Sequence, residues 1–166
     1  MNKKNYISLA NKAANIQIKE LKKIKKIFNK SFVKAVDLIL NCKGKIIFAG
    51  IGKSGLIARK ISATFSSVGM PSFFCDPAQA LHGDMGQIEK KDILIIFSYS
   101  GNTLELTNML KYANRYRIKI IGVASKPDSV LLKASDIKLI LPKVKFWDSV
   151  SLSKLLTINV LTNFFV

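Results

Sequence analysis

Several residue types and patterns are scarce in this 166-residue sequence, and each scarcity argues against a class of protein. Its two cysteines, Cys42 and Cys75, have neither a CxxC nor a Cys/His spacing, which argues against a disulfide framework and a cysteine-based zinc site. No window of about 18 residues is apolar and uncharged, as a membrane span requires. Nine lysines also interrupt the first 30 residues, where a signal peptide would be apolar. We therefore expect a cytoplasmic protein with no membrane contact, no metal site and two reduced cysteines that pack as small apolar residues.

Arginine is also scarce, although the chain is strongly basic. The net charge is +17, yet only three of the 27 basic residues are arginines: Arg59, Arg115 and Arg117. Proteins that recognise bases and phosphates rely on bidentate arginine contacts, which lysine does not make. We therefore predict a solvated lysine surface rather than a nucleic-acid interface, and leave open a basic face that attracts an anionic metabolite.

The rest of the composition is that of one folded domain, with 49% apolar and 22% charged residues. Helical patterns come first along the chain. Apolar residues recur at three- and four-residue spacing from residue 6 to residue 28, which predicts an amphipathic helix packed against another surface. A second helix is predicted over residues 32–40, ahead of Gly44.

From residue 45 onward, short apolar runs alternate with helical patterns. Such runs are typical of strands buried on both faces of a parallel sheet and joined by right-handed crossover helices. The sequence therefore predicts an α/β fold: a three-layer αβα sandwich of the Rossmann or flavodoxin type with a five-stranded parallel sheet, preceded by the N-terminal helices. The predicted strands cover residues 45–49, 71–75, 92–97, 118–124 and 137–141, and the predicted helices cover residues 54–69, 103–116 and 129–134.

A glycine-rich loop, Gly-Ile-Gly-Lys-Ser-Gly at residues 50–55, follows the first predicted strand and opens a helix. It fits the GxGxxG pattern, and Asp76 lies 21 residues after Gly55, so a dinucleotide-binding domain is an open alternative. A nucleotide-binding P-loop is excluded, because that motif requires glycine where Ile47 stands. We expect the glycines to permit close backbone approach, Ser54 to cap the helix, and the N–H groups at the helix start to attract a phosphate.

A second polar loop follows the predicted strand at residues 92–97. Residues 98–103, Ser-Tyr-Ser-Gly-Asn-Thr, bring three aliphatic hydroxyls, one amide and one glycine to the start of a helix. Neutral donors around a helix N-terminus favour a bound phosphate, and Thr103 is placed to cap the helix. Ligands of such sheets bind at the carboxyl ends of the strands, so we expect both loops to belong to the site.

These two loops, together with Leu-His-Gly-Asp-Met-Gly at residues 81–86, resemble the SIS (sugar isomerase) domain of bacterial D-arabinose 5-phosphate isomerases over residues 5–145. The resemblance implies interconversion of D-ribulose 5-phosphate and D-arabinose 5-phosphate through an enediol, which supplies the precursor of Kdo for lipopolysaccharide or capsule. It implies no cofactor, a pentose phosphate as the substrate, and a homo-oligomer, either tetramer or dimer. The stripe of the first helix is a candidate for burial in that subunit contact.

Moving a proton between two carbons requires a base that works near neutral pH and a group that stabilises the developing oxyanion. By the resemblance, Lys53, His82 and Glu105 occupy the catalytic positions. His82 is the only histidine, and imidazole titrates near neutrality. Glu105 lies in the first turn of a predicted helix, where the helix dipole also favours an acidic residue for structural reasons. The residues that correspond to substrate-binding positions are Gly52, Ser54, Ser98, Ser100, Gly101, Asn102 and Thr103.

The resemblance ends at residue 145. Position 146 is Phe where the family pattern has Glu, and neither a second catalytic histidine nor CBS domains follow. We therefore predict a SIS domain over residues 1–145 and a divergent apolar tail over residues 146–166, which we expect to be helical. The chain then resembles a truncated member of the family, and a non-catalytic domain that binds a sugar phosphate is the alternative to an active isomerase.

Overall fold

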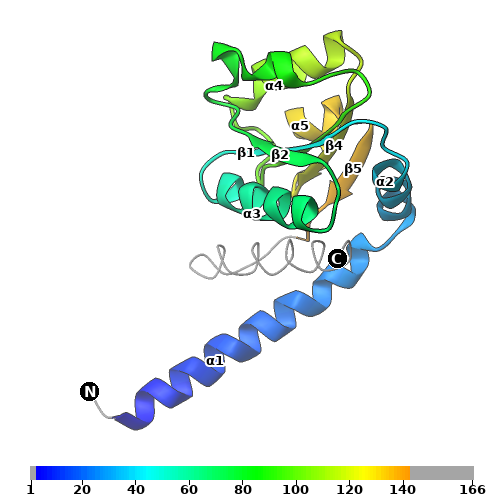
Figure 1. Ribbon diagram of the computed structural model, residues 1–166. Helices are drawn as coiled ribbons and strands as arrows, with labels where there is room; N and C mark the ends of the chain where they lie inside the picture. Colours follow the sequence, from blue (N-terminus) through cyan, green and yellow to red (C-terminus); the bar gives the residue numbers. More distant parts are fainter. Residues whose placement is uncertain (1–2, 143–166) are drawn as a thin grey trace.

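The computed structural model describes residues 3–142, which form a five-stranded sheet with helices on both sides (Figure 1). The strands lie in the order β2-β1-β3-β4-β5, and every neighbouring pair is parallel. The predicted αβα sandwich with N-terminal helices is thereby confirmed. In chain order, with η marking 3₁₀ helices, the elements are α1 (Lys3–Lys22), η1 (Lys23–Ile27), α2 (Lys30–Leu40), β1 (Ile46–Gly50), α3 (Lys53–Ser67), β2 (Ser72–Cys75), η2 (Ala80–His82), η3 (Asp84–Gln87), β3 (Ile93–Phe97), α4 (Leu106–Arg115), β4 (Lys119–Ala124), α5 (Val130–Ala134) and β5 (Ile137–Ile140).

The three layers follow from strands that are apolar on both faces. Every residue of β1 and β3 is buried, because successive side chains point to opposite faces and helices cover both. On one face Phe48 and Ile95 belong to a core formed with α2 and α3, and on the other Leu94 and Ile96 belong to a core formed with α4 and α5. Figure 1 shows the two pairs of helices on opposite sides of the sheet.

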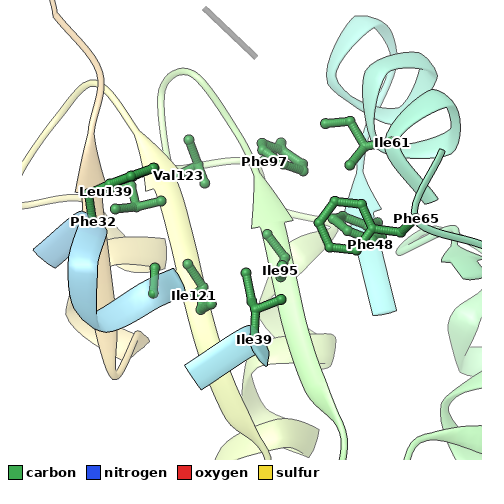
Figure 2. Close-up of a pocket in the computed structure, with 11 residues that line it drawn as sticks. Phe32, Ile39, Phe48, Ile61, Phe65, Ile95, Phe97, Ile121, Val123 and Leu139 are labelled. Atoms are coloured by element: carbon green, nitrogen blue, oxygen red, sulfur yellow. The ribbon is translucent and has the colours of Figure 1, made fainter. Parts of the chain in front are cut away.

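The face under α2 and α3 holds an aromatic cluster. Phe48 meets Phe65 edge-to-face with 5.0 Å between ring centroids, and it stacks on Phe97 at 6.4 Å. A cavity of about 40 Å³ lies here, and every lining residue in the described part of the chain is apolar (Figure 2). These side chains offer no group that would bind a phosphate or a sugar hydroxyl, so this cavity is not the ligand site.

The N-terminal helix departs from the expectation in two respects. It ends at Lys22 rather than near residue 28, and the chain continues as the 3₁₀ helix η1. Its apolar stripe is also left uncovered, since Ile7 and Ile18 are 70% and 52% exposed. Figure 1 shows α1 projecting away from the sheet. Within residues 3–142 of the single chain no surface covers this stripe, so its burial in a subunit contact stays a prediction.

The segment between β2 and β3 contains two short helices, η2 and η3, that the sequence pattern does not predict. The predicted helix at residues 146–166 lies outside the described residues. Between residues 3 and 142, no helix combines the length and the apolar character that a bilayer span requires.

Candidate functional site

The three polar motifs all follow strands at the carboxyl edge of the sheet. Strand β1 lies between β2 and β3, with Ala49 opposite Cys75 and Gly50 opposite Phe97. The loops that leave these strands therefore start side by side. The chain runs from β1 outward to β2 and then returns to β3 on the other side of β1, so β1 and β3 flank the point where the strand order reverses. Ligands of open parallel sheets bind at this switch point.

The glycine loop after β1 brings strand and helix close together. A Cβ on Gly55 would lie 2.6 Å from the Gly50 carbonyl oxygen, and a Cβ on Gly50 would lie 2.9 Å from the Ser54 carbonyl carbon. Real side chains do not approach backbone atoms this closely, so both positions require glycine for packing. Gly52 differs, because it has φ +57° and no heavy atom within 4 Å of its Cβ position. The expectation of close backbone approach is thus met at Gly50 and Gly55.

The start of α3 corrects the predicted role of Ser54. The helix begins at Lys53, and Gly52 occupies the N-cap position without a side-chain hydrogen bond. Ser54 therefore lies inside the first turn, half-buried, and does not cap the helix. With no side-chain cap, the first N–H groups of α3 have no partner from Gly52 and remain suited to an anion. Lys53 itself is exposed at this helix end.

The loop after β3 is organised by its own hydroxyls. The buried Ser98 hydroxyl pairs with Thr103 Oγ1 at 2.8 Å and accepts the Gly101 N–H at 3.1 Å. Ser100 is exposed, and its Oγ accepts the Asn102 N–H at 3.3 Å. Ser98 and Thr103 thus shape the loop from within, whereas Ser100 stands on its outer surface.

Helix α4 begins later than predicted. Its first residue is Leu106, and the turn before it is closed by bonds from the Leu106 N–H to the Thr103 carbonyl and from the Thr107 N–H to the Leu104 carbonyl, at 3.2 and 3.0 Å. Thr103 therefore does not cap α4, because its hydroxyl is bonded to Ser98 instead. Glu105 occupies the N-cap position rather than the first turn, and its side chain makes no capping bond.

The loop is also held from behind by the segment that follows β4. The Gly101 carbonyl accepts the Leu131 N–H at 2.9 Å, and Asn102 Oδ1 accepts the Val130 N–H at 2.9 Å. The predicted ligand-binding amide Asn102 thus uses its oxygen to cap α5. The Ser125 N–H and Oγ also donate to the loop, and the Tyr99 carbonyl accepts both bonds. Sequence reasoning misses these partners because they lie 26 to 30 residues from their loop residues along the chain.

His82 ends η2, which contacts α4 on the same face of the sheet. Ala80 and Ile88 anchor this segment in the core that α4 helps to form. His82 is exposed, as are Lys53 and Glu105. All three predicted catalytic residues therefore lie in segments that leave the carboxyl ends of strands, with their side chains accessible, and none of the ion pairs described within residues 3–142 involves them.

Cys75 is the last residue of β2, so this cysteine lies at the end of the sheet from which the candidate loops leave. Burial, with smaller contributions from the carboxylates of Asp84 and Asp76, raises the pKa of the Cys75 thiol to about 11. The thiol is therefore protonated near neutral pH, and it is a packing residue rather than a nucleophile. Among residues 3–142, no three His, Cys, Asp or Glu side chains gather as a metal site.

A family model for the SIS domain matches residues 39–161. The match begins in α2 and runs past residue 145, where the motif resemblance ends. The domain boundary at residue 145 stays a prediction.

Two curated relatives show how far the similarity extends. An uncharacterized protein of Rickettsia prowazekii is 41% identical over 143 residues, which cover 86% of this chain and 45% of the relative. The arabinose 5-phosphate isomerase KdsD of Pseudomonas aeruginosa is 45% identical over 108 residues, which cover 65% of this chain and 33% of the relative. The chain spans less than half the length of both relatives.

A solved structure covers nearly all of the chain. An Escherichia coli CFT073 protein in complex with arabinose 5-phosphate has a TM-score of 0.89 at 29% identity, covering 99% of this chain and 92% of that chain. The similarity therefore includes the arrangement of the whole sheet and not only the motif loops.

Proposed function

Because this chain belongs to the SIS domain family, we propose that the carboxyl edge of its sheet binds a sugar phosphate. The observation that carries the proposal is the convergence of two loops at the β1/β3 switch point, each leading into a helix of at least ten residues. The first loop offers the N–H groups at the uncapped start of α3, and the second offers the exposed Ser100 hydroxyl. Such neutral donors stabilise a phosphate without a metal. The sugar phosphate bound in the E. coli structure supports the same ligand class.

The reaction that we propose is the interconversion of D-ribulose 5-phosphate and D-arabinose 5-phosphate through an enediol. Its support is the activity for which the Pseudomonas aeruginosa relative is named, together with the motif positions of Lys53, His82 and Glu105. In this scheme Glu105 or His82 moves the proton between the two carbons, and Lys53 stabilises the charge that develops on oxygen. Gly52, Ser54 and the loop of residues 98–103 hold the phosphate and the sugar. A role in the cytoplasm, in supplying the precursor of Kdo for lipopolysaccharide or capsule, belongs to the same proposal.

We propose further that the working form is a homo-oligomer. Exposed leucines stand beside each candidate catalytic residue: Leu56 is 70%, Leu81 55% and Leu104 82% exposed. An active site that protonates a carbanion-like intermediate must exclude water, and this edge is open in the single chain. Burial of these leucines and of the α1 stripe against further copies would both close the site and remove apolar surface from water.

A second candidate function is binding without turnover. The accessible positions of Lys53, His82 and Glu105, which no described part of the single chain shields from water, favour it. In this case the two loops still hold a sugar phosphate, and the protein acts as a sensor or regulatory module.

One experiment separates the two functions. The purified chain is incubated with D-ribulose 5-phosphate in D₂O, and proton and phosphorus NMR spectra are recorded on the same sample. An isomerase produces arabinose 5-phosphate with deuterium at C2. A perturbed phosphorus signal without product indicates binding alone, and unchanged spectra in both channels contradict the proposed ligand class.

A further inference from the structure

We infer that residues 125–131, which run from the end of β4 into the first turn of α5, position the loop of residues 98–103 for ligand binding. Residues 125–131 are called the backing segment below. The inference rests on the proposed function, because the ligand is the sugar phosphate proposed above. Ser125 is the principal positioning residue, and it acts through the loop without facing the ligand.

Ser125 fixes the first half of the loop. Its N–H and its Oγ both donate to the Tyr99 carbonyl, at 2.9 and 2.7 Å. The side chain is 5% exposed, so solvent does not replace these bonds. The Ser98 N–H donates to the Val123 carbonyl at 3.0 Å, just before the loop leaves the sheet. The β3–β4 pairing therefore continues beyond the strand ends into the loop.

Helix α5 fixes the second half. The first N–H groups of a helix have no partner within the helix, and the loop supplies two: the Gly101 carbonyl accepts from Leu131 and Asn102 Oδ1 accepts from Val130, both at 2.9 Å. The Leu132 N–H goes to Ser129 Oγ at 3.5 Å. The start of α5 is therefore capped partly by the site loop, and each element stabilises the other.

The turn of the loop fits against the same segment. Gly101 has φ +66°, and a Cβ there would collide with the Ser129 side chain, which is 1% exposed. The left-handed turn is thus enclosed as well as hydrogen-bonded. Sites bind more tightly when their donors are held in place before the ligand arrives, because the ligand then does not have to order them.

The test compares S125A with S135A. Ser135 is a matched control because it is also buried, at 8% exposure against 5%, and its Oγ also donates one 2.7 Å bond to a backbone carbonyl, that of Leu131. Its bond joins the residue after α5 to the Leu131 carbonyl and makes no contact with the loop itself. Amide hydrogen exchange at Gly101 and Asn102 is measured first without ligand, and arabinose 5-phosphate is then titrated into the same samples and followed by phosphorus NMR.

We expect S125A to exchange Gly101 and Asn102 N–H groups about five-fold faster than the wild-type chain and to bind arabinose 5-phosphate about five-fold more weakly, as loss of one buried hydrogen bond predicts. S135A should leave both quantities unchanged, although both variants melt earlier. Unchanged exchange in S125A overturns the inference whether or not the ligand binds. Faster exchange with wild-type affinity overturns it too. Failure of the wild-type chain to bind contradicts the proposed function instead, and the exchange result alone then decides whether the backing segment holds the loop.

Discussion

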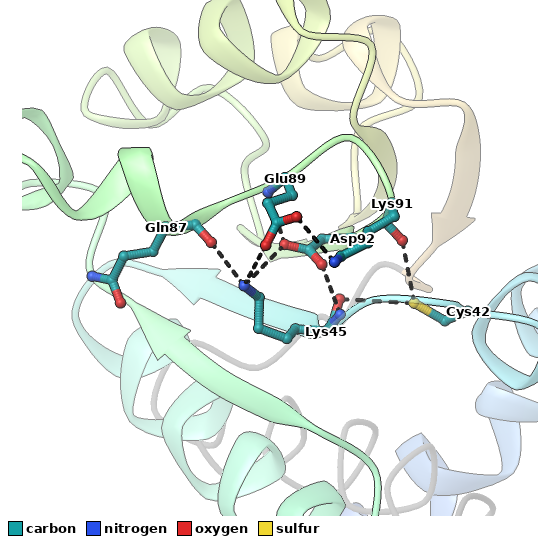
Figure 3. A network of polar contacts seen from close by, with 6 residues as sticks. All are labelled: Cys42, Lys45, Gln87, Glu89, Lys91 and Asp92. Atoms are coloured by element: carbon teal, nitrogen blue, oxygen red, sulfur yellow. Dashed lines mark hydrogen bonds and ion pairs between the residues drawn. The ribbon is translucent and has the colours of Figure 1, made fainter.

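The two edges of the sheet use polar groups in opposite ways. At the amino edge, carboxylates point inward and hold the backbone. Asp92 is 1% exposed, and its oxygens accept the Lys45 and Glu89 N–H groups at 2.7 and 2.8 Å, with Lys45 Nζ at 3.6 Å (Figure 3). At the carboxyl edge, neutral groups organise the loops that follow β3 and β4: the Ser98 hydroxyl, the Asn102 amide and the Ser125 hydroxyl.

The difference explains why one edge is a candidate site and the other is not. Charges at the amino edge are already satisfied by partners within the chain, such as the pair of Lys119 with Asp136 at 2.7 Å. At the carboxyl edge, Lys53, His82 and Glu105 remain exposed and carry no described ion pair within residues 3–142. A fold that builds its loops from neutral groups leaves its ionisable groups free for a ligand.

The strongest test of this contrast is E105Q. If the proposed isomerase is correct, loss of the carboxylate should lower turnover at least about 100-fold, because proton transfer by a positioned base contributes about this much or more. The melting temperature should stay within about 2 °C of the wild-type value, since an exposed side chain without a capping bond contributes little to folding. Turnover is measured by NMR and melting by circular dichroism. Full turnover in E105Q would remove Glu105 from the mechanism.

For D92A at the amino edge we expect lower stability and unchanged ligand binding. The partly buried Lys45 and Glu89 N–H groups lose the buried carboxylate that accepts from both, which should lower the free energy of unfolding by about 3 kcal/mol. Arabinose 5-phosphate affinity should be unchanged at temperatures where the variant is folded. Urea denaturation gives the stability, with E89Q as the control, because Glu89 belongs to the same network but its side chain is 53% exposed. Equal stability of D92A and E89Q would show that the buried carboxylate does not hold this edge.

Sequence patterns predict the sheet well and the contacts between its loops poorly. Each buried strand is a short apolar run, so the chain itself carries that information. Helix caps depend instead on which polar groups the folded chain brings together. The Thr103 hydroxyl bonds to the Ser98 hydroxyl, and Asn102 Oδ1 accepts the N–H of Val130, 28 residues away. The α1 stripe likewise predicts a helix but not its contact surface, which lies outside the single chain in the oligomer that we propose.

Two glycines of the first loop have different roles: Gly55 is required for packing, and Gly52 lies in open space where we expect the ligand. G55A should lower the free energy of unfolding by about 2 to 3 kcal/mol, because its Cβ would lie 2.6 Å from the Gly50 carbonyl oxygen. G52A should cost about 1 kcal/mol, since its only penalty is the positive φ of +57° in open space. Urea denaturation of both variants measures the difference. A larger loss in G52A than in G55A would reverse this assignment.

The smallest effect concerns pH and again belongs to the amino edge. Burial alone would raise the pKa of Asp136, but hydrogen bonds from Lys119 and the Ile120 N–H outweigh it and hold the pKa below its ordinary value. A lowered pKa in the folded state adds stability above the ordinary value of about 3.9, and this stability is lost as the pH falls through the folded pKa.

The difference in unfolding free energy between the wild-type chain and D136N should therefore shrink as the pH is lowered from about 6 to about 3. It should stay below about 1 kcal/mol throughout, since the Asp136 and Lys119 side chains are 36% and 57% exposed and solvent screens the pair. Urea denaturation at several pH values measures it, and carboxylates common to both proteins cancel in the difference. A constant difference over this range would mean that the charge of Asp136 does not stabilise the fold. Of Asp92 and Asp136, only Asp92 would then hold the backbone of the amino edge through its charge.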